Sequence, residues 1–230
     1  MKSRASLQFA AYIEHVKEVV LYGTADLAYW RELLTPERLF PYNDHGRAGI
    51  LISVPQVVWK GARFNELSVS VAVSARADGQ TADGFYLPHA FNSLRSFAFM
   101  ERLFFHTPYD YAEVQVSERI PARFAVKHGA EMVCEGKMSG DRLPARAELE
   151  HFEGPVYLPR NKYFIARISG MTGFYPFQTG DMLTLKASTH EKVFQQLLES
   201  NFTAGEWRIR EDAVHGKSKT FRSEKSPIAS

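Results

Sequence analysis

The sequence has little of several features that mark specialised proteins. Its single cysteine, Cys134, excludes an internal disulfide and a cysteine-rich metal site, as is typical of a reducing compartment. Lys and Arg total 28 against 26 Asp and Glu, so a net charge of +2 favours neither nucleic acid nor an anionic membrane as a partner. Residues 1–20 lack the order of a signal peptide, and no apolar run approaches membrane-spanning length. We therefore expect a soluble, cytoplasmic protein.

The common catalytic signatures are also missing. There is no phosphate-binding glycine loop, dinucleotide fingerprint, zincin helix or GxSxG elbow. The 8 histidines do not pair at metal-ligand spacing, so neither a metal site nor a cofactor is expected. Cys134 follows Val133 in an expected strand, which favours a buried structural thiol over a nucleophile.

What is present indicates one globular domain with an ample core. Hydrophobic residues make up 45% of the 230 residues and charged residues 23%, which are ordinary values. The aromatic content of 13% suggests a wide core or an aromatic-lined cavity. Since no linker or repeat divides the chain, we predict one domain over residues 1–230. Its ordered core spans about residues 11–215, with loose tails at 1–10 and 217–230.

Many short apolar segments alternate with turn residues, while only residues 92–105 and 189–200 have substantial helical patterns. The pattern predicts an α+β fold with a mainly antiparallel sheet and two main helices packed on it. Residues 143–159, rich in proline and acidic residues, are expected to be a long connection. The helix at 92–105 is apolar almost all round, which predicts burial by the rest of the domain. One polar line interrupts it, and it consists of Asn92, Arg95, Arg102 and His106.

A resemblance to a known family adds to these patterns. The segments FNELSVSVAV, GFYLPHAF and MERLFFHTPYDYAEVQV resemble the acetoacetate decarboxylase-like superfamily. The likeness extends more weakly from about Val19 to Ile209, and the order and spacing of several loose motifs carry it. The resemblance implies a curved, mainly antiparallel β-cone or barrel that encloses a pocket, with the 92–105 helix at its side.

The resemblance also implies a difference between this sequence and the decarboxylase in the turn after the helix. In the decarboxylase, the turn after this helix has a proline and then two lysines, one of which forms a Schiff base with a keto acid. The matching turn here reads Thr107-Pro108-Tyr109-Asp110, without lysine. Ordinary acetoacetate decarboxylation is therefore disfavoured, unless a lysine reaches the pocket from elsewhere. The lysines considered for this are Lys60, Lys127 and Lys162.

The proposed catalytic residues are Glu66 and Tyr109. Glu66 matches the acid of the family's aromatic-x-Glu segment, which implies a general acid/base with a raised pKa at the pocket wall. The alternation of residues along this strand, taken alone, favours a structural interpretation of Glu66 as a strand-end carboxylate in solvent or in an ion pair. Tyr109 occupies the place of the lysine and could donate a hydrogen bond to a substrate carbonyl; a packed turn tyrosine is the equal alternative.

The proposed substrate-binding residues are Arg95, Arg102, His89 and Asn92. A guanidinium group suits a substrate carboxylate, although a polar stripe on an apolar helix is most often its solvent side. His89 and Asn92 lie at the strand-to-helix corner and could line the pocket, while an isolated histidine is more often structural.

The function expected from these observations is acid/base chemistry on a small molecule. The enzyme hypothesis covers lyase, dehydratase, hydrolase or cyclase steps on a carbonyl-containing organic acid or a polyketide-like substrate, without a Schiff base at the usual position. The alternative is a non-catalytic binding protein that retains the pocket. The expected partner is a small-molecule substrate, with no nucleic acid and no membrane. Self-association into a homo-oligomer is left open.

Overall fold

The structure is a computed structural model that describes residues 8–187 and 192–222. The strands in these ranges form an 11-stranded sheet and a 4-stranded sheet. The larger sheet contains β1 (Phe9–Asp26), β2 (Phe40–Pro41), β3 (Asn43–Asp44), β4 (Arg47–Trp59), β5 (Ala62–Ser74), β6 (Gly84–Asn92), β7 (Tyr109–Tyr111), β11 (Arg146–Leu158), β12 (Lys162–Pro176), β14 (Thr203–Ser218) and β15 (Phe221–Arg222). The smaller sheet contains β8 (Glu113–Ser117), β9 (Arg123–His128), β10 (Glu131–Lys137) and β13 (Met182–Leu185).

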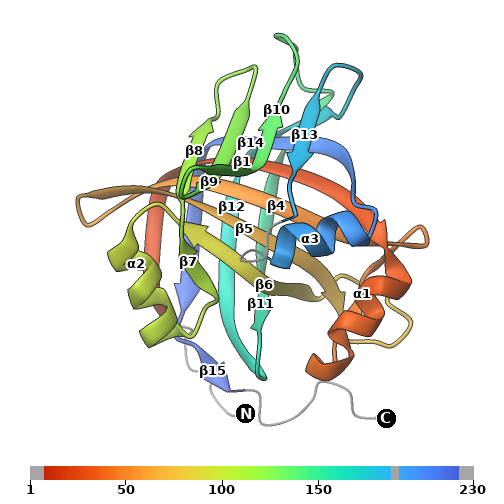
Figure 1. Ribbon diagram of the computed structural model, residues 1–230. Coiled ribbons are helices and arrows are strands. Elements are labelled where there is room, and N and C mark those ends of the chain that lie inside the picture. Colours follow the sequence, from red (N-terminus) through yellow and green to blue (C-terminus); the bar gives the residue numbers. More distant parts are fainter. Residues whose placement is uncertain (1–7, 188–191, 223–230) are drawn as a thin grey trace.

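The larger sheet closes into a ring of long strands (Figure 1). Its order β5-β4-β1-β14-β12-β11-β6 returns to its start because β6 also pairs with β5. Most pairs are antiparallel; β6 pairs in parallel with β11 and β7. The mainly antiparallel sheet predicted from the sequence is confirmed.

Helices and the smaller sheet cover one outer side of this ring. The helices are α1 (Leu27–Leu34), the 3₁₀ turn η1 (Thr35–Glu37), α2 (Arg95–Met100), the π-helical turn η2 (Glu101–Phe105) and α3 (Lys192–Glu199). The largest hydrophobic cluster joins Leu21 of β1 to Phe124 of β9 and Phe194 of α3. Because strand side chains alternate, Leu21 faces this core while its neighbour Val20 faces the inside of the ring. Within the described ranges, no helix is long and apolar enough to cross a membrane.

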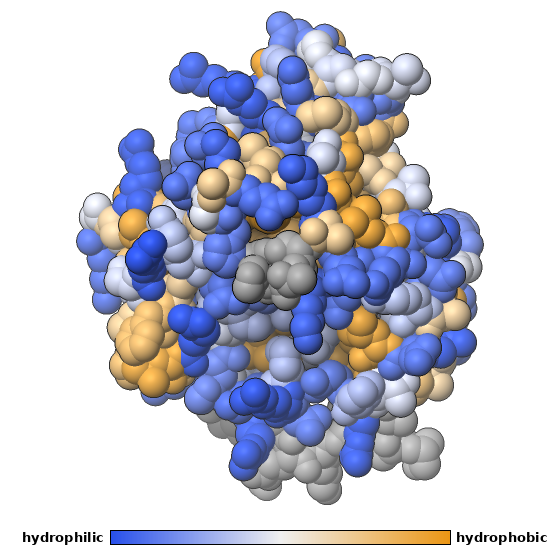
Figure 2. Space-filling model, viewed as in Figure 1, coloured by the Kyte–Doolittle hydropathy of each residue, from blue (hydrophilic) through white to orange (hydrophobic). Residues whose placement is uncertain are grey.

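The prediction of a fully buried helix at residues 92–105 is wrong. The segment forms α2 and η2 on the outside of the ring, where Phe99 and Phe104 are 55% and 59% exposed. Hydrophobic residues gather over α2 in Figure 2. The inner face is apolar as well, since Phe97 and Phe105 turn toward the ring. Apolar residues on both faces gave the sequence the pattern of a buried helix, although only one face is covered.

Two other segments also differ from expectation. Residues 143–159 contain the long strand β11 rather than a connection. The prediction failed because the first half of β11 shows no apolar alternation, with Glu148 and Leu149 both exposed. The predicted loose tail at 217–230 is wrong for its start, since Lys217 and Ser218 belong to β14 and residues 221–222 form β15. At the other end, Phe9 already belongs to β1. Residues 1–7, 223–230 and the expected helix start at 189 lie outside the described residues. Cys134 is buried, as predicted.

Candidate active site

A cavity of about 440 Å³ lies inside the ring, and each ring strand contributes side chains to its wall. Helix α2, η2 and β7 complete the wall at one end. The lining is largely apolar and aromatic, and includes Val20, Leu51, Val57, Trp59, Phe64, Phe85, Leu87, Phe97, Phe105, Phe152, Val156, Phe164 and Ile168. Small ligands bind in enclosed apolar spaces that hold a few polar groups, so the polar groups here are the candidates for function.

Glu66 is the centre of the first polar group. Its Oε2 accepts a hydrogen bond from the Tyr109 hydroxyl at 2.9 Å, and its Oε1 accepts one from Asn92 Nδ2 at 2.9 Å. Burial, and then the nearby charge of Glu101, raise the pKa of Glu66 to about 7, against the lowering effects of Tyr109 and other neighbours. A carboxyl group with this pKa exchanges protons readily near neutral pH.

Strand pairing explains why these residues meet. Glu66 of β5 lies opposite Asn92 of β6 in the antiparallel register. Tyr109 lies beside Ala90 in the parallel pair of β6 and β7. Between them the chain leaves η2 through His106, whose φ of 57° is left-handed and turns the backbone toward β7. This turn therefore delivers Tyr109 to the cavity.

Lys217 is a lysine of the cavity that the sequence did not reveal. Its Nζ donates a hydrogen bond to Glu101 and lies 4.6 Å from the ring centre of Phe105 and 4.8 Å from that of Phe164. It comes from β14, in the segment predicted to be a loose tail. The lysines considered instead lie elsewhere in the described chain: Lys60 covers Trp59 at the β4–β5 turn, Lys127 is in β9 and Lys162 begins β12.

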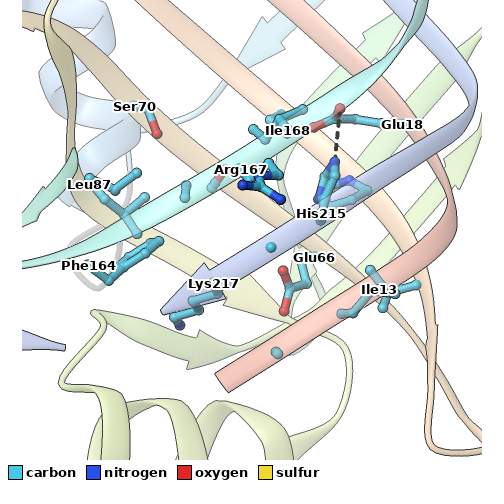
Figure 3. A pocket seen from close by; sticks show the side chains of 18 of the residues that line it. Ile13, Glu18, Glu66, Ser70, Leu87, Phe164, Arg167, Ile168, His215 and Lys217 are labelled. Atoms are coloured by element: carbon cyan, nitrogen blue, oxygen red, sulfur yellow. Dashed lines mark hydrogen bonds and ion pairs between the residues drawn. The ribbon is translucent and has the colours of Figure 1, made fainter. Parts of the chain in front are cut away.

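A second polar group lies on β1, β4 and β14. Glu18 accepts hydrogen bonds from Arg210 Nη1 at 2.6 Å and from the Ser53 hydroxyl. His215 Nε2 lies 3.5 Å from Glu18 Oε2. Burial alone would raise the pKa of Glu18, but the charge of Arg210, with smaller contributions from His215 and Ser53, holds this pKa well below its usual value. Arg210 also binds Glu150 and Thr172. Figure 3 shows His215 and Lys217 on one strand, with Glu66 beside the same space.

Four of the predicted site residues are not part of the cavity wall, although one of them, the buried Asn92, binds Glu66. Arg95 is exposed and stacks on the Tyr111 ring at 4.5 Å. Arg102 is also on the outer helix face and pairs with Asp110 at 2.8 Å. His89 packs against Phe91 because a register shift between β5 and β6 turns it away from the side that Leu87 faces. The structure thus brings together Glu66, Tyr109 and Asn92, and leaves Arg95, Arg102 and His89 apart from them.

Solved structures resemble this architecture over almost its whole length. The enduracididine biosynthesis enzyme MppR, complexed with the condensation product of pyruvate and imidazole 4-carboxaldehyde, matches with a TM-score of 0.62 at 14% identity, covering 99% of this chain and 94% of its own. The chain has the acetoacetate decarboxylase-like fold. An acetoacetate decarboxylase-like enzyme from Sphingomonas wittichii RW1 matches with a TM-score of 0.60 at 11% identity, covering 97% of each chain. Acetoacetate decarboxylase from Legionella pneumophila matches with a TM-score of 0.62 at 11% identity, covering 97% of this chain and 93% of its own.

The decarboxylase-like fold confirms the resemblance seen in the sequence. No family model matches the chain, and no curated protein matches it. The structural neighbours of this fold include enzymes that act on small molecules. Because the identities are 11–14%, the likeness carries the fold, and the chemistry must be argued from the residues of this chain.

Proposed function

We propose that this protein is a small-molecule enzyme that transfers protons next to a substrate carbonyl. Glu66 is the acid/base and Tyr109 the hydrogen-bond donor to the carbonyl oxygen. The observation that carries the proposal is their contact: Tyr109 Oη lies 2.9 Å from Glu66 Oε2 at the wall of a largely apolar cavity. Proton abstraction needs a base of suitable pKa and a donor for the oxyanion, and both are present within one hydrogen bond.

The chemical step is enolisation. When a carbonyl oxygen lies beside the phenol, the Tyr109 O–H turns from Glu66 to that oxygen, since a hydroxyl hydrogen rotates freely. Oε2 of Glu66 is then free to take the α-proton, while Asn92 still holds Oε1. The C–H electron pair forms the new C=C bond, and the carbonyl π pair moves to the oxygen that Tyr109 stabilises. Lyase, dehydratase, hydrolase or cyclase steps could all follow from this enolate.

Lys217 supplies positive charge near this centre rather than a Schiff base. Its amine is hydrogen-bonded to Glu101, and an amine held by a carboxylate is not free to attack a carbonyl. The aromatic rings around Lys217 favour the alternative role of a Schiff-base nucleophile, because an apolar pocket makes a lysine amine a suitable nucleophile. Borohydride reduction in the presence of acetoacetate, followed by intact mass measurement, separates these roles. We expect no adduct; an adduct on Lys217 would replace the proposed mechanism with an iminium route.

Hydrogen–deuterium exchange tests the proposed step without knowledge of the substrate. Heptan-2-one is a neutral ketone of a size that the cavity accepts, and its α-deuteration in D₂O can be followed by proton NMR. We expect exchange with the wild-type protein and a loss of about a hundredfold or more in Glu66→Gln. Glu148→Gln, at an exposed position of β11, is the matched control and should exchange like the wild type. Equal rates in wild type and Glu66→Gln would contradict the proposal.

The alternative is a binding protein that keeps the cavity without the chemistry. The absence of lysine from the matching turn favours it, whereas the raised pKa of Glu66 favours catalysis. The same experiment decides between them. Binding of heptan-2-one without exchange, measured by NMR shift changes, would support the binding protein.

A further inference from the structure

His215 is a partly buried titratable group that the proposed enolisation does not use. Its side chain lines the cavity and is 20% exposed. The Nε2 atom is enclosed, has no hydrogen bond at normal distance, and faces Glu18 Oε2 at 3.5 Å. A carboxylate on one ring nitrogen fixes the tautomer and orientation of an imidazole, and the other nitrogen is then available for a ligand. Within the described residues, Nδ1 of His215 has no hydrogen-bond partner.

The carboxylate of Glu18 is itself rigidly held. Arg210 and Ser53 donate hydrogen bonds to its two oxygens, and Arg210 is anchored in turn by Thr172 at 2.8 Å. Glu18 lines the cavity but is only 1% exposed, so little of its carboxylate is open to a small molecule. Glu18 and Arg210 therefore form a fixed support behind His215, and the imidazole is the part that faces the cavity.

This histidine lies at a definite position relative to the first polar group. His215 and Lys217 are two residues apart on β14, so their side chains lie on the same face, about 7 Å apart along the strand. Lys217 contacts Glu101, whose charge acts on Glu66. The cavity thus has polar groups at two places, which we call the Glu66 end and the His215 end. The surrounding wall is apolar, with Leu87, Phe164 and Ile168 among its residues (Figure 3).

The cations of the cavity indicate what kind of molecule fits between these ends. Each arginine or lysine in the lining already has a carboxylate partner. The pairs are Arg167 with Glu153, Arg208 with Glu150 and Glu206, Arg210 with Glu18 and Glu150, and Lys217 with Glu101. A substrate carboxylate would have to compete with these partners, whereas a neutral oxygen needs only a hydrogen bond.

We propose that His215 is a second catalytic acid/base group, oriented by Glu18, and that the substrate is an uncharged, largely apolar molecule with two oxygen functions. One oxygen lies at the Glu66 end and the other at the His215 end. The His215 imidazole donates a proton to the second oxygen, or removes one from it, while the chemistry proceeds at the first. The substrate class rests on the proposed function, but the ligand contact of His215 can be measured separately.

A pair of probes tests the proposal in the full-length protein. 6-Hydroxyheptan-2-one and heptan-2-one have the same chain length, and the first carries a hydroxyl group in addition to the carbonyl. NMR titration gives the dissociation constant of each, and α-deuteration gives the exchange rate. We expect the wild type to bind the hydroxyketone about tenfold more tightly, because its hydroxyl donates one additional hydrogen bond, to Nδ1 of His215. We also expect the His215 ring signals to shift with the hydroxyketone and not with heptan-2-one.

Variants separate the two ends. His215→Gln should lose the preference for the hydroxyketone and keep its exchange of heptan-2-one, whereas Glu66→Gln should lose exchange of both probes and keep the preference in binding. His151→Gln, an exposed histidine at the cavity rim, is the matched control and should retain both properties. Binding preference without exchange in the wild type would overturn the proposed enolisation but support the His215 contact. Equal affinity for the two probes, or binding of neither, would overturn the present proposal.

The positioning role of Glu18 has its own readout. In the wild type, ¹⁵N shifts of the neutral imidazole should show the proton on Nε2, the nitrogen that faces Glu18. Glu18→Gln should give a mixture of tautomers and a weaker preference for the hydroxyketone, whereas a merely structural role would leave the tautomer unchanged. If Glu18→Gln does not fold, the wild-type tautomer decides: a proton fixed on Nδ1 would contradict the proposed orientation.

Discussion

Glu66 and Glu18 are the same residue type on the wall of one cavity, yet the pKa values of their carboxyl groups move in opposite directions. Burial raises the pKa of both. At Glu66 the hydrogen-bond donors are the neutral Tyr109 and Asn92, and the carboxylate of Glu101 lies nearby, so the raised value persists. At Glu18 the charge of Arg210 reverses the effect of burial. The comparison shows that the charge of the partner decides whether a buried carboxyl group can exchange protons or serves as a fixed anion.

The largest expected effect comes from removing Arg210, the cation that binds the Glu18 carboxylate. Arg210→Met removes the cation between Glu18 and Glu150 and should lower the free energy of unfolding by about 3–5 kcal/mol, because buried carboxylates lose their partner. Urea denaturation measures the change. The control is Arg102→Met, which removes a half-exposed pair with Asp110 and should cost about 0–1 kcal/mol. Similar losses of unfolding free energy in the two variants would show that Arg210 stabilises the fold no more than a half-exposed ion pair does.

The next effect concerns pH and distinguishes the two carboxyl groups by sign. The pKa of Glu66 is raised from 4.5 to about 7 by folding, so its contribution to stability is present below pH 4.5 and is lost as pH rises toward 7. The difference in unfolding free energy between wild type and Glu66→Gln should therefore fall over this range and level off above it. Urea denaturation at a series of pH values measures the difference. A flat difference would show that the pKa of Glu66 is not raised.

Glu18 should show the opposite dependence. Its folded pKa is lowered, so its contribution to stability is present above the usual glutamate value and is lost as pH falls below it. The unfolding free energy of the wild type should therefore decrease in acid. In Arg210→Met the cause of the lowered pKa is gone, and the decrease should begin at a higher pH.

A smaller effect is expected from the donor at the Glu66 end. Tyr109→Phe removes the hydroxyl that binds Glu66, so exchange of heptan-2-one should slow about fivefold to tenfold. The pH at which exchange is half-maximal should rise, because the Tyr109 hydrogen bond lowers the pKa of Glu66. Tyr111→Phe, at the neighbouring β7 position that stacks with Arg95, is the control and should leave the exchange rate unchanged. A wild-type rate in Tyr109→Phe would remove Tyr109 from the mechanism.

The smallest effect concerns one hydrogen bond at the other end. Ser53→Ala removes a donor to Glu18 while Arg210 remains, and should lower the unfolding free energy by about 1 kcal/mol. Ser70→Ala, at another serine of the same cavity, should change it by less than about 0.5 kcal/mol. A loss in Ser53→Ala as large as that in Arg210→Met would mean that hydrogen bonding, rather than charge, sets the state of Glu18.

The Glu66 end could be approached from the sequence because its parts are close along the chain. Glu66, Asn92 and Tyr109 lie on neighbouring strands within one stretch of loose motifs. The resemblance indicated Glu66 and Tyr109, and the strand-to-helix corner indicated Asn92. The polar line of the helix indicated Arg95 and Arg102, which lie on the outer helix face. Side-chain direction on a helix that is apolar all round cannot be read from residue types alone.

The His215 end was missed because its parts come from opposite ends of the chain. Glu18 and Arg210 are 192 residues apart and meet only through the antiparallel pairing of β1 with β14. Lys217 was assigned to a basic tail, since its neighbours are polar and small. The alternation of Ala213, His215 and Lys217 on one face of β14 was a possible signal. It is weak because it covers only three positions and Gly216 lies on the opposite face.

The sequence by itself determined the mainly antiparallel sheet and, through its resemblance to a known family, the decarboxylase-like fold. The sheet follows from local alternation and turn residues and the resemblance from the order of motifs, which are properties of neighbouring residues. Only the tertiary structure decided the directions of the pKa shifts of Glu66 and Glu18, which cations are already paired and which lysine enters the cavity. Those properties depend on the charges and hydrogen-bond donors that ring closure brings next to each side chain, and these come from strands far apart in the chain.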